Sequence, residues 1–189
     1  MSATTASLDE IVIRRNMRRA RARVDLRRGN AKAPAMSPEI ERFLNAAGVD
    51  HRLHRHPPVV SFVEAKAALP FDPAATVKGL VFRLPGGGYA IVAMRGDARA
   101  DYKKIADALG VRRSALKPAT EEELVRDLGM PPGGVAPLPV RGATVLFDRR
   151  TLELDVVYCG AGRPDATLEI RRADLVRVAG GATADVTKD

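Results

Sequence analysis

The feature that most constrains the fold of this chain is a glycine-rich turn between two apolar stretches. Residues 79–84 and 89–93 are dominated by aliphatic and aromatic side chains, and Pro85-Gly86-Gly87-Gly88 separates them. Glycine readily adopts the positive φ angles that a tight turn between antiparallel strands requires. The pattern therefore predicts a β-hairpin, and with it a fold that contains an antiparallel sheet. The glycines do not form a phosphate loop, because the spacing G-x-x-x-x-G-K-[ST] is absent.

Helix and strand signals alternate irregularly on both sides of this hairpin. Two capping boxes, Ser61 with Glu64 and Thr120 with Glu123, each mark the start of a helix. Helices are predicted over residues 37–48, 61–69, 101–109 and 120–129, with a last one from about 173, and further strands over 51–60, 143–147, 154–158 and 167–170. Hairpins outnumber clear β-helix-β units. We therefore expect an α+β (mixed α/β) single domain, with helices packed on a mostly antiparallel sheet.

Charge divides the chain into two parts. The 189 residues include 31 basic and 23 acidic side chains, a net charge of +8. Residues 1–36 hold nine basic and three acidic side chains, so they carry +6 and leave +2 for residues 37–189. We expect a basic, flexible N-terminal arm over 1–36 and one folded domain over 37–189. Such an arm suits a polyanion partner, such as nucleic acid or an anionic surface, although a solvated tail without a specific partner fits equally well.

Other features of the composition exclude several classes of protein. A single cysteine rules out an intramolecular disulfide framework. No apolar run approaches the roughly 18 residues that span a bilayer. The apolar residues 11–13 are followed at once by arginines, unlike the longer apolar core of a signal peptide. These features predict a soluble, cytoplasmic protein that is not bound to a membrane.

The three histidines of the chain are clustered as His51, His54 and His56. On a strand, His54 and His56 would share a face and could ligate a metal ion. No nearby cysteine, and no carboxylate other than Asp50, completes a ligand set, and the interleaved arginines would repel a dication. We therefore expect a surface strand and no metal.

Cys159 is a candidate nucleophile only in principle. A catalytic thiol needs a base beside it, and the histidines lie far upstream in the sequence. Because Cys159 ends an apolar strand, we expect a small buried residue there.

Two further positions could bind a substrate. Lys78 stands at the start of a predicted strand, where an ammonium group could reach a phosphate or a carboxylate. Residues 133–137 (Gly-Gly-Val-Ala-Pro) form a loop with exposed backbone amides that could bind an ester carbonyl or its oxyanion. Taken alone, each has an ordinary structural interpretation as a strand-end lysine or a connecting loop.

The order of these segments resembles the YbaK/ProX family, the free-standing relatives of the prolyl-tRNA synthetase editing domain. The resemblance rests on residues 76–82, the glycine hairpin, Gly96-Asp97, residues 101–104, Leu128-Gly129, the 133–137 loop, Phe147-Asp148 and Cys159-Gly160. It covers roughly residues 38–187, which excludes the arm.

This resemblance implies a YbaK-like fold and hydrolysis of the ester bond of a mischarged aminoacyl-tRNA. The family's lysine falls on Lys78, which would anchor the tRNA 3′ end, and the amides of Gly133 and Gly134 would position the aminoacyl carbonyl. The attacking water would be organised by the terminal ribose hydroxyl of the substrate, so neither a cofactor nor a metal is implied. Substrate-binding positions implied by the family are Val135, Ala136, Pro137, His56, Asp148, Cys159 and Gly160.

Aminoacyl-tRNA is the implied partner, and an aminoacyl-tRNA synthetase is a second candidate. Two positions depart from the family pattern: Gly79 replaces a common Thr or Asn, and Cys159 replaces a common Ser. They keep open a non-catalytic module that binds aminoacyl-tRNA or a synthetase. A general basic nucleic-acid binder is a further alternative, but eight Phe and Tyr and no Trp leave few stacking surfaces.

Overall fold

A computed structural model describes residues 36–59, 63–64, 67 and 69–188. The predicted arm lies outside the described residues except for Met36. Ser61 also lies outside the described residues, and with it the first predicted capping box. Much of the helix predicted over 61–69 lies outside them as well.

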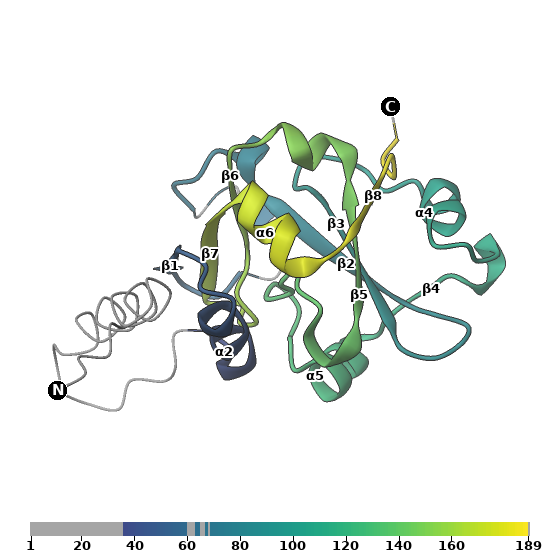
Figure 1. The fold of residues 1–189 in the computed structure, drawn as a ribbon, viewed down its shortest axis with the longest axis horizontal. Helices are drawn as coiled ribbons and strands as arrows, with labels where there is room; N and C mark the ends of the chain where they lie inside the picture. Colours follow the sequence, from purple (N-terminus) through teal and green to yellow (C-terminus); the bar gives the residue numbers. More distant parts are fainter. Residues whose placement is uncertain (1–35, 60–62, 65–66, 68, 189) are drawn as a thin grey trace, which may run out of the picture. The chain divides into compact units, whose positions relative to one another are not determined.

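The described strands form two sheets (Figure 1). The smaller sheet has the order β1-β7-β6 and is antiparallel throughout. Its strands are β1 (His51–Arg55), β6 (Val156–Gly160) and β7 (Ala166–Arg171). An isolated bridge between Thr76 and Tyr158 joins it to the larger sheet. The junction of the two sheets therefore lies where β2 begins and β6 passes.

The larger sheet has the order β4-β2-β3-β5-β8 and contains the predicted hairpin. Its strands are β2 (Val77–Arg83), β3 (Tyr89–Arg95), β4 (Lys117–Pro118), β5 (Thr144–Asp148) and β8 (Ala182–Ala184). β2 pairs antiparallel with β3 and β4, whereas β5 pairs parallel with both β3 and β8. The hairpin is confirmed; the parallel pairs are an addition that no local signal predicted.

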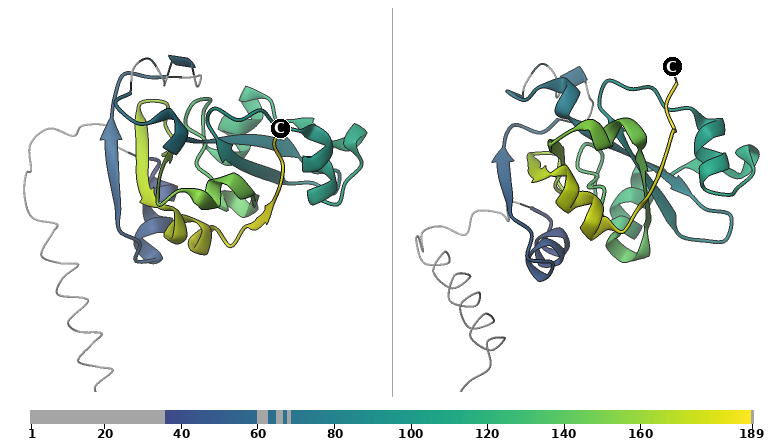
Figure 2. Two further views of the ribbon diagram at one scale, coloured as in Figure 1. Left: turned by 90° about the horizontal axis from the view of Figure 1, so that it is seen from above. Right: turned by 45° about the horizontal axis from the view of Figure 1, so that its top comes forward.

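Within the described residues, four complete α-helices lie around the sheets (Figure 2). They are α2 (Pro38–Ala46), α4 (Tyr102–Ala108), α5 (Glu121–Leu128) and α6 (Arg172–Ala179). Short 3-10 turns are η1 (Pro73–Ala75), η2 (Arg113–Ala115), η3 (Val140–Gly142) and η4 (Arg149–Glu153). The predicted Thr120–Glu123 capping box is present at the start of α5, and Asp101 accepts hydrogen bonds from the amides of Lys103 and Lys104 at the start of α4. These caps satisfy amides that have no partner within the helix.

Apolar side chains cover both faces of the larger sheet. Ile91 and Phe147 belong to a cluster that includes residues of α2, α5 and α6, whereas Val92 and Leu146 belong to a second cluster that includes residues of α4. Successive residues of a strand point to opposite faces, so residues 90–94 are all buried. The centre of this sheet is packed on both sides, and ligands must approach it at an edge.

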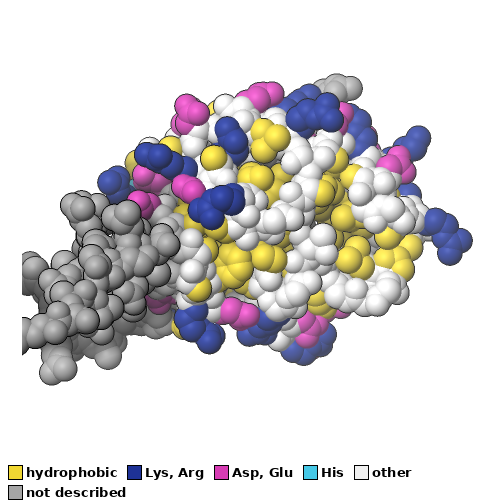
Figure 3. Space-filling model, in the orientation of Figure 1, with side chains coloured by type: hydrophobic (Ala, Val, Ile, Leu, Met, Phe, Trp, Pro, Cys, Tyr) yellow, Lys and Arg dark blue, Asp and Glu magenta, His cyan; other side chains and the backbone are white. Residues whose placement is uncertain are grey.

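These elements make up the mixed α+β, mostly antiparallel fold that the sequence predicted. On the face drawn in Figure 3, apolar side chains are visible across the middle and charged side chains stand mainly around the margin. No helix within the described residues is long and apolar enough to cross a membrane.

Candidate functional site

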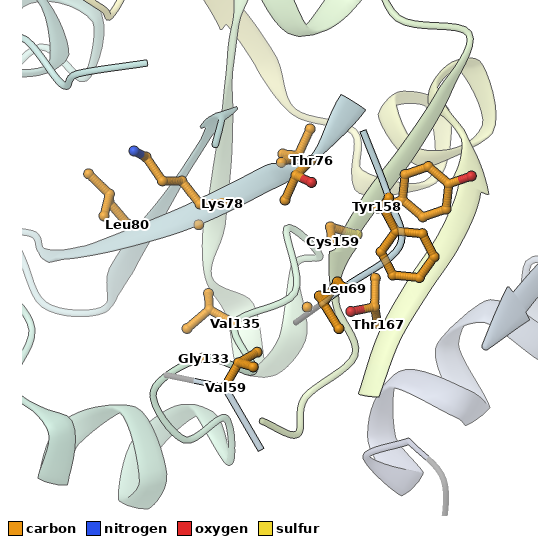
Figure 4. Close-up of a pocket in the computed structure, with 14 residues that line it drawn as sticks. Val59, Leu69, Thr76, Lys78, Leu80, Gly133, Val135, Tyr158, Cys159 and Thr167 are labelled. Carbon is orange, nitrogen blue, oxygen red and sulfur yellow. The ribbon is translucent and has the colours of Figure 1, made fainter. Parts of the chain in front are cut away.

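A pocket of about 250 Å³ lies where β2, β6 and the 133–137 loop meet (Figure 4). It is lined by Val59, Leu69, Phe71, Thr76, Val77, Lys78, Gly79, Leu80, Gly133, Val135, Tyr158, Cys159, Gly160 and Thr167. Most of these side chains are apolar, and none is a carboxylate or an imidazole. The pocket is smaller than the roughly 300–1,000 Å³ of a drug-sized site, so its volume suits a group the size of an amino acid.

The edge of β2 presents backbone groups to this pocket. The carbonyl of Thr76 accepts from the Gly96 amide, and the Leu84 amide donates to the carbonyl of Gly88. Because these bonds flank the β2–β3 ladder, the even-numbered residues of β2 are the ones that hydrogen-bond to β3. The odd-numbered residues then point their N–H and C=O groups away from β3, as the bond from the Ala119 amide to the Val81 carbonyl illustrates. Gly79 has the same orientation as Val81. It therefore offers one donor and one acceptor to the pocket.

Glycines in the 133–137 loop and at the end of β6 allow these two segments to pack closely. A Cβ on Gly160 would collide with the carbonyl oxygen of Val135, and one on Gly134 would lie 2.5 Å from the backbone nitrogen of Arg163. Gly162 donates a hydrogen bond of 2.7 Å to the carbonyl of Gly134. The loop backbone thus approaches β6 at a separation that any larger residue would prevent.

The loop also inserts a side chain between the sheets. A Cβ on Gly79 would lie 2.7 Å from Cγ1 of Val135, so Val135 occupies the space that a side chain at position 79 would take. Gly79 stands where the family commonly has Thr or Asn, and the lack of a side chain there lets Val135 pack directly over β2.

Only some of the loop amides are available to a ligand. The Gly134 amide donates to the carbonyl of Pro131 at 2.9 Å, and the Ala136 amide points to Sδ of buried Met130 at 3.3 Å. Within the described part of the chain, the amides of Gly133 and Val135 have no acceptor. Gly133 and Val135 line the pocket, whereas Gly134, Ala136 and Pro137 support the loop from behind.

Lys78 lies on β2 beside the pocket, but its ammonium group is directed to a neighbouring turn. Nζ donates to the carbonyls of Gly96 at 2.9 Å and Ala98 at 2.7 Å. Partial burial lowers the pKa of Lys78, and the carboxylate of Asp97 opposes that shift. Lys78 thus fixes the 96–98 turn to the wall of the pocket. In Figure 4 its side chain extends away from Cys159 and Tyr158.

Cys159 lines the pocket as a buried thiol. It is 3% exposed, and burial raises its pKa to about 12. A thiol with this pKa stays protonated near neutral pH and is a poor nucleophile. The expectation of a small buried residue at the end of the strand is confirmed, and the thiol adds apolar surface to the pocket.

The three histidines have separate partners. His51 Nδ1 lies 3.0 Å from the Val49 carbonyl, and His54 Nε2 lies 2.5 Å from a carboxylate oxygen of Glu169. Among the residues that the structure describes, no three His, Cys, Asp or Glu side chains form a group that could hold a metal ion.

His56 lies just behind the pocket. Its Nδ1 lies 2.7 Å from the Pro57 carbonyl and must therefore donate, so Nε2 of the neutral ring accepts from the hydroxyl of Thr167 at 3.0 Å. Thr167 lines the pocket, whereas His56 itself does not. His56 therefore orients a lining hydroxyl.

Asp148 lies away from the pocket. It is fully buried at the end of β5, where Oδ1 accepts from the Arg150 amide and Oδ2 accepts from the Val186 amide and the Thr187 hydroxyl. Its carboxylate holds the C-terminal segment against η4.

Several pocket residues have no local signature in the sequence. Phe71 and Tyr158 stack at a ring separation of 4.3 Å, and His54 meets the edge of Phe71 at 4.8 Å. Sequence reasoning missed Val59, Leu69, Phe71, Tyr158 and Thr167. An apolar residue that lines a pocket has the same local pattern as one that fills a core, so only the fold distinguishes them.

Residues 56–178 match the aminoacyl-tRNA editing domain family, so the chain belongs to that family. No curated protein matches the chain.

Solved structures share the fold. A hypothetical protein designated APE2540 is 30% identical with a TM-score of 0.71, and the match covers 79% of this chain and 99% of that one. A protein described as a candidate trans-editing enzyme for prolyl-tRNA synthetase is 25% identical with a TM-score of 0.70, covering 82% and 99%. A candidate signal transduction protein from Marinobacter aquaeolei VT8 is 18% identical with a TM-score of 0.62, covering 84% of this chain and 31% of that one, and shows the fold alone.

Proposed function

We propose that the protein hydrolyses the ester bond of mischarged aminoacyl-tRNA in trans. The observation that carries this proposal is the convergence of Lys78, Gly133, Val135 and Cys159-Gly160 on one small apolar pocket, in a chain of the aminoacyl-tRNA editing domain family. A synthetase separates amino acids that differ by one methylene by only about 1–3 kcal/mol, so a second, hydrolytic site adds the missing discrimination.

The pocket holds the aminoacyl group against backbone donors. The open edge of β2 at Gly79 offers one N–H and one C=O to the polar atoms of the amino acid. The amides of Gly133 and Val135 are the loop donors that remain for the ester carbonyl. One well-placed donor of this kind accounts for roughly 10²–10³ in rate, because negative charge develops on that oxygen in the transition state.

Hydrolysis needs little from the side chains. Water forms a bond to the ester carbonyl carbon, the bond from that carbon to the ribose oxygen breaks, and a proton from water ends on the released ribose hydroxyl. The described lining residues include no carboxylate or imidazole that could act as a base, and the Cys159 thiol stays protonated. As the family resemblance implies, the adjacent ribose hydroxyl of the substrate would orient the water, and the protein would contribute position and electrostatics.

Lys78 anchors the tRNA 3′ end in this proposal. Its ammonium group donates to two carbonyls in the absence of RNA, and a phosphate of the terminal nucleotides would offer it a stronger, charged acceptor. The description of one relative names prolyl-tRNA synthetase. The tRNA for proline is therefore the first substrate to test, and prolyl-tRNA synthetase is a candidate partner. The cytoplasm, where aminoacyl-tRNA is used, is the proposed location.

The test is deacylation of a panel of tRNAs charged with amino acids of increasing side-chain volume. We expect hydrolysis of a small, uncharged aminoacyl group, and a fall of about tenfold or more in kcat/KM for Lys78→Met, as expected for loss of a charged hydrogen bond worth about 1.5–3 kcal/mol. Lys103→Ala, an exposed lysine on α4, is the matched control. Failure to hydrolyse any charged tRNA would contradict the proposal.

The described lining residues include no acid–base side chain, which also favours a second candidate, a module that binds aminoacyl-tRNA or a synthetase without turnover. The same panel separates the two functions, because this module would retain the charged tRNA and protect its ester from spontaneous hydrolysis.

A further inference from the structure

A second pocket, which the proposed reaction does not use, is lined by charged side chains. It measures about 410 Å³ and is lined by Arg95, Asp97, Ala98, Arg99, Arg150 and Lys188. Four of these six residues are cationic and one is anionic. We infer that this basic pocket binds backbone phosphates of the tRNA acceptor end; the inference rests on the proposed function in that the RNA is the aminoacyl-tRNA held in the first pocket.

The lining as a whole is strongly positive, with four cations and one carboxylate. Arg95 pairs with that carboxylate, Asp97, with Nε to Oδ1 at 3.3 Å and a terminal nitrogen to Oδ2 at 3.1 Å. The other three cations, Arg99, Arg150 and Lys188, belong to exposed residues. Such a cluster of cations on a concave surface attracts a polyanion, and guanidinium groups match the geometry of phosphate oxygens.

Backbone contacts and one buried carboxylate hold the segments that carry these cations together, although they are far apart in sequence. The amide of Lys188 donates to the carbonyl of Arg99 at 2.8 Å, and Ala100 and Thr187 form an antiparallel bridge. Asp148, with no exposed surface, accepts from the amides of Arg150 and Val186 and from the hydroxyl of Thr187. The buried carboxylate therefore ties the segment that carries Lys188 to the turn that carries Arg150.

Lys78 connects the two pockets. It lines the apolar pocket, and its ammonium group binds the carbonyl of Ala98, which lines the basic pocket. Thr76 at the start of β2 also accepts a 2.7 Å hydrogen bond from the Gly96 amide. An RNA strand whose terminal aminoacyl group enters the apolar pocket thus meets the basic pocket immediately across the 96–98 turn.

The experiment measures how the affinity for deacylated tRNA depends on salt concentration. It compares the full chain with the triple variant Arg99→Ala/Arg150→Ala/Lys188→Ala. Each lost contact to single-stranded RNA lowers the log–log salt slope by about 0.7, so loss of three contacts lowers it by about 2. Between about 50 and 200 mM salt, the affinity of the wild-type protein should then fall roughly 20-fold more than that of the triple variant. In deacylation, KM should rise and kcat should stay constant, because these cations do not touch the reacting atoms.

The control variant is Arg42→Ala/Arg171→Ala/Arg177→Ala. It removes the same amount of charge from α2, the end of β7 and α6, at residues that line neither pocket. It should keep the wild-type slope. Equal slopes for wild-type protein and the first triple variant, with deacylation intact, would overturn the inference alone.

Other outcomes separate the inference from the proposed function. Wild-type protein that neither binds nor deacylates tRNA would overturn both. Protein that binds tRNA with the predicted loss of slope in the triple variant, yet hydrolyses nothing, would support the basic pocket and contradict the hydrolase.

Discussion

The two pockets of this domain are built in opposite ways. The apolar pocket depends on the absence of side chains: Gly79, Gly134 and Gly160 let the 133–137 loop close onto β2 and β6. The basic pocket depends on long charged side chains presented by exposed segments and held by one buried carboxylate. The first can discriminate by shape and is intolerant of added atoms, whereas the second can attract RNA of any sequence. An editing domain needs both properties, because its reactive group is small and its substrate is a polyanion.

The strongest test of this contrast is Gly160→Ala. The new Cβ would collide with the Val135 backbone, so the loop must move and the amides of Gly133 and Val135 leave the pocket. We expect a fall in kcat of at least about 100-fold, as for loss of a backbone oxyanion donor, and a loss of about 1–3 kcal/mol in the free energy of unfolding.

Gly86→Ala is the matched control for that variant, since a Cβ there meets nothing within 4 Å. Single-turnover deacylation and thermal unfolding measure both effects. A Gly160→Ala protein with wild-type kcat would show that the loop position does not matter.

Asp148→Ala tests whether the buried carboxylate holds the segments of the basic pocket together. The substitution leaves the amides of Arg150 and Val186 and the hydroxyl of Thr187 without their buried acceptor. At about 1–3 kcal/mol for each unsatisfied group, we expect a loss of several kcal/mol in the free energy of unfolding and a weaker salt dependence of tRNA binding.

Urea titration of Asp148→Ala and Asp148→Asn distinguishes these effects. The asparagine keeps one acceptor oxygen, so its stability should lie between those of wild type and alanine. An alanine variant as stable as wild type would show that the C-terminal segment is held by other contacts.

Gly79→Ala should alter substrate preference. The added methyl group would lie 2.7 Å from Cγ1 of Val135 and 3.3 Å from Cγ2 of Ile91, so Val135 must shift, and we expect it to shift toward the pocket. We expect the ratio of kcat/KM between a larger and a smaller aminoacyl group to fall by about tenfold, within the range of one methylene. The double variant Gly79→Ala/Val135→Ala should restore part of that ratio, and a ratio unchanged in the single variant would place the side-chain subsite elsewhere.

Cys159→Ala tests how ionisation of the buried thiol affects the stability of the protein. Burial raises the pKa of this thiol from 9.0 to about 12, so the folded state binds the proton more tightly than the unfolded state does. The stability from this group is fully present below pH 9.0 and is lost as pH rises from 9.0 toward about 12. The alanine variant should lack that slope, of at most about 1.4 kcal/mol per pH unit, in denaturant unfolding at alkaline pH.

The same variant also tests catalysis by the thiol. The shape of the pH–rate profile between about pH 6 and 9 should match that of wild type, because a thiol of such high pKa contributes no inflection there. An inflection that disappears in Cys159→Ala would mean that the thiolate takes part in the reaction.

The smallest expected effect concerns the N-terminal arm, which carries +6 against the +2 of the remaining residues. Met36 is 4% exposed within the core, so the deletion should cover residues 1–35. If the arm binds phosphates, the deletion lowers the salt slope of tRNA binding by about 0.7 per lost contact to single-stranded RNA, in addition to the effect of the basic pocket. An unchanged slope would assign the salt dependence to the folded domain.

Much of the fold followed from local sequence signals. The glycine turn predicted the β2–β3 hairpin, and Asp101 and the Thr120–Glu123 box predicted the starts of α4 and α5. These features are determined by residues within one turn of each other, so they can be read without the rest of the chain. The short strand β8 and its parallel pairing with β5 had no such signal, because they depend on which segments meet.

For the site, the sequence specifies which chemical groups the chain carries, among them a strand-end lysine, a glycine loop and a cysteine next to a glycine. The fold sets the surroundings of each group. It directs Lys78 toward the 96–98 turn, leaves the Gly133 and Val135 amides without an acceptor among the described residues, bonds Asp148 to the amide of Arg150, and brings Arg99, Arg150 and Lys188 together from distant segments. The physical reason is that hydrogen bonding, burial and electric field depend on distance in space, and the sequence specifies only distance along the chain.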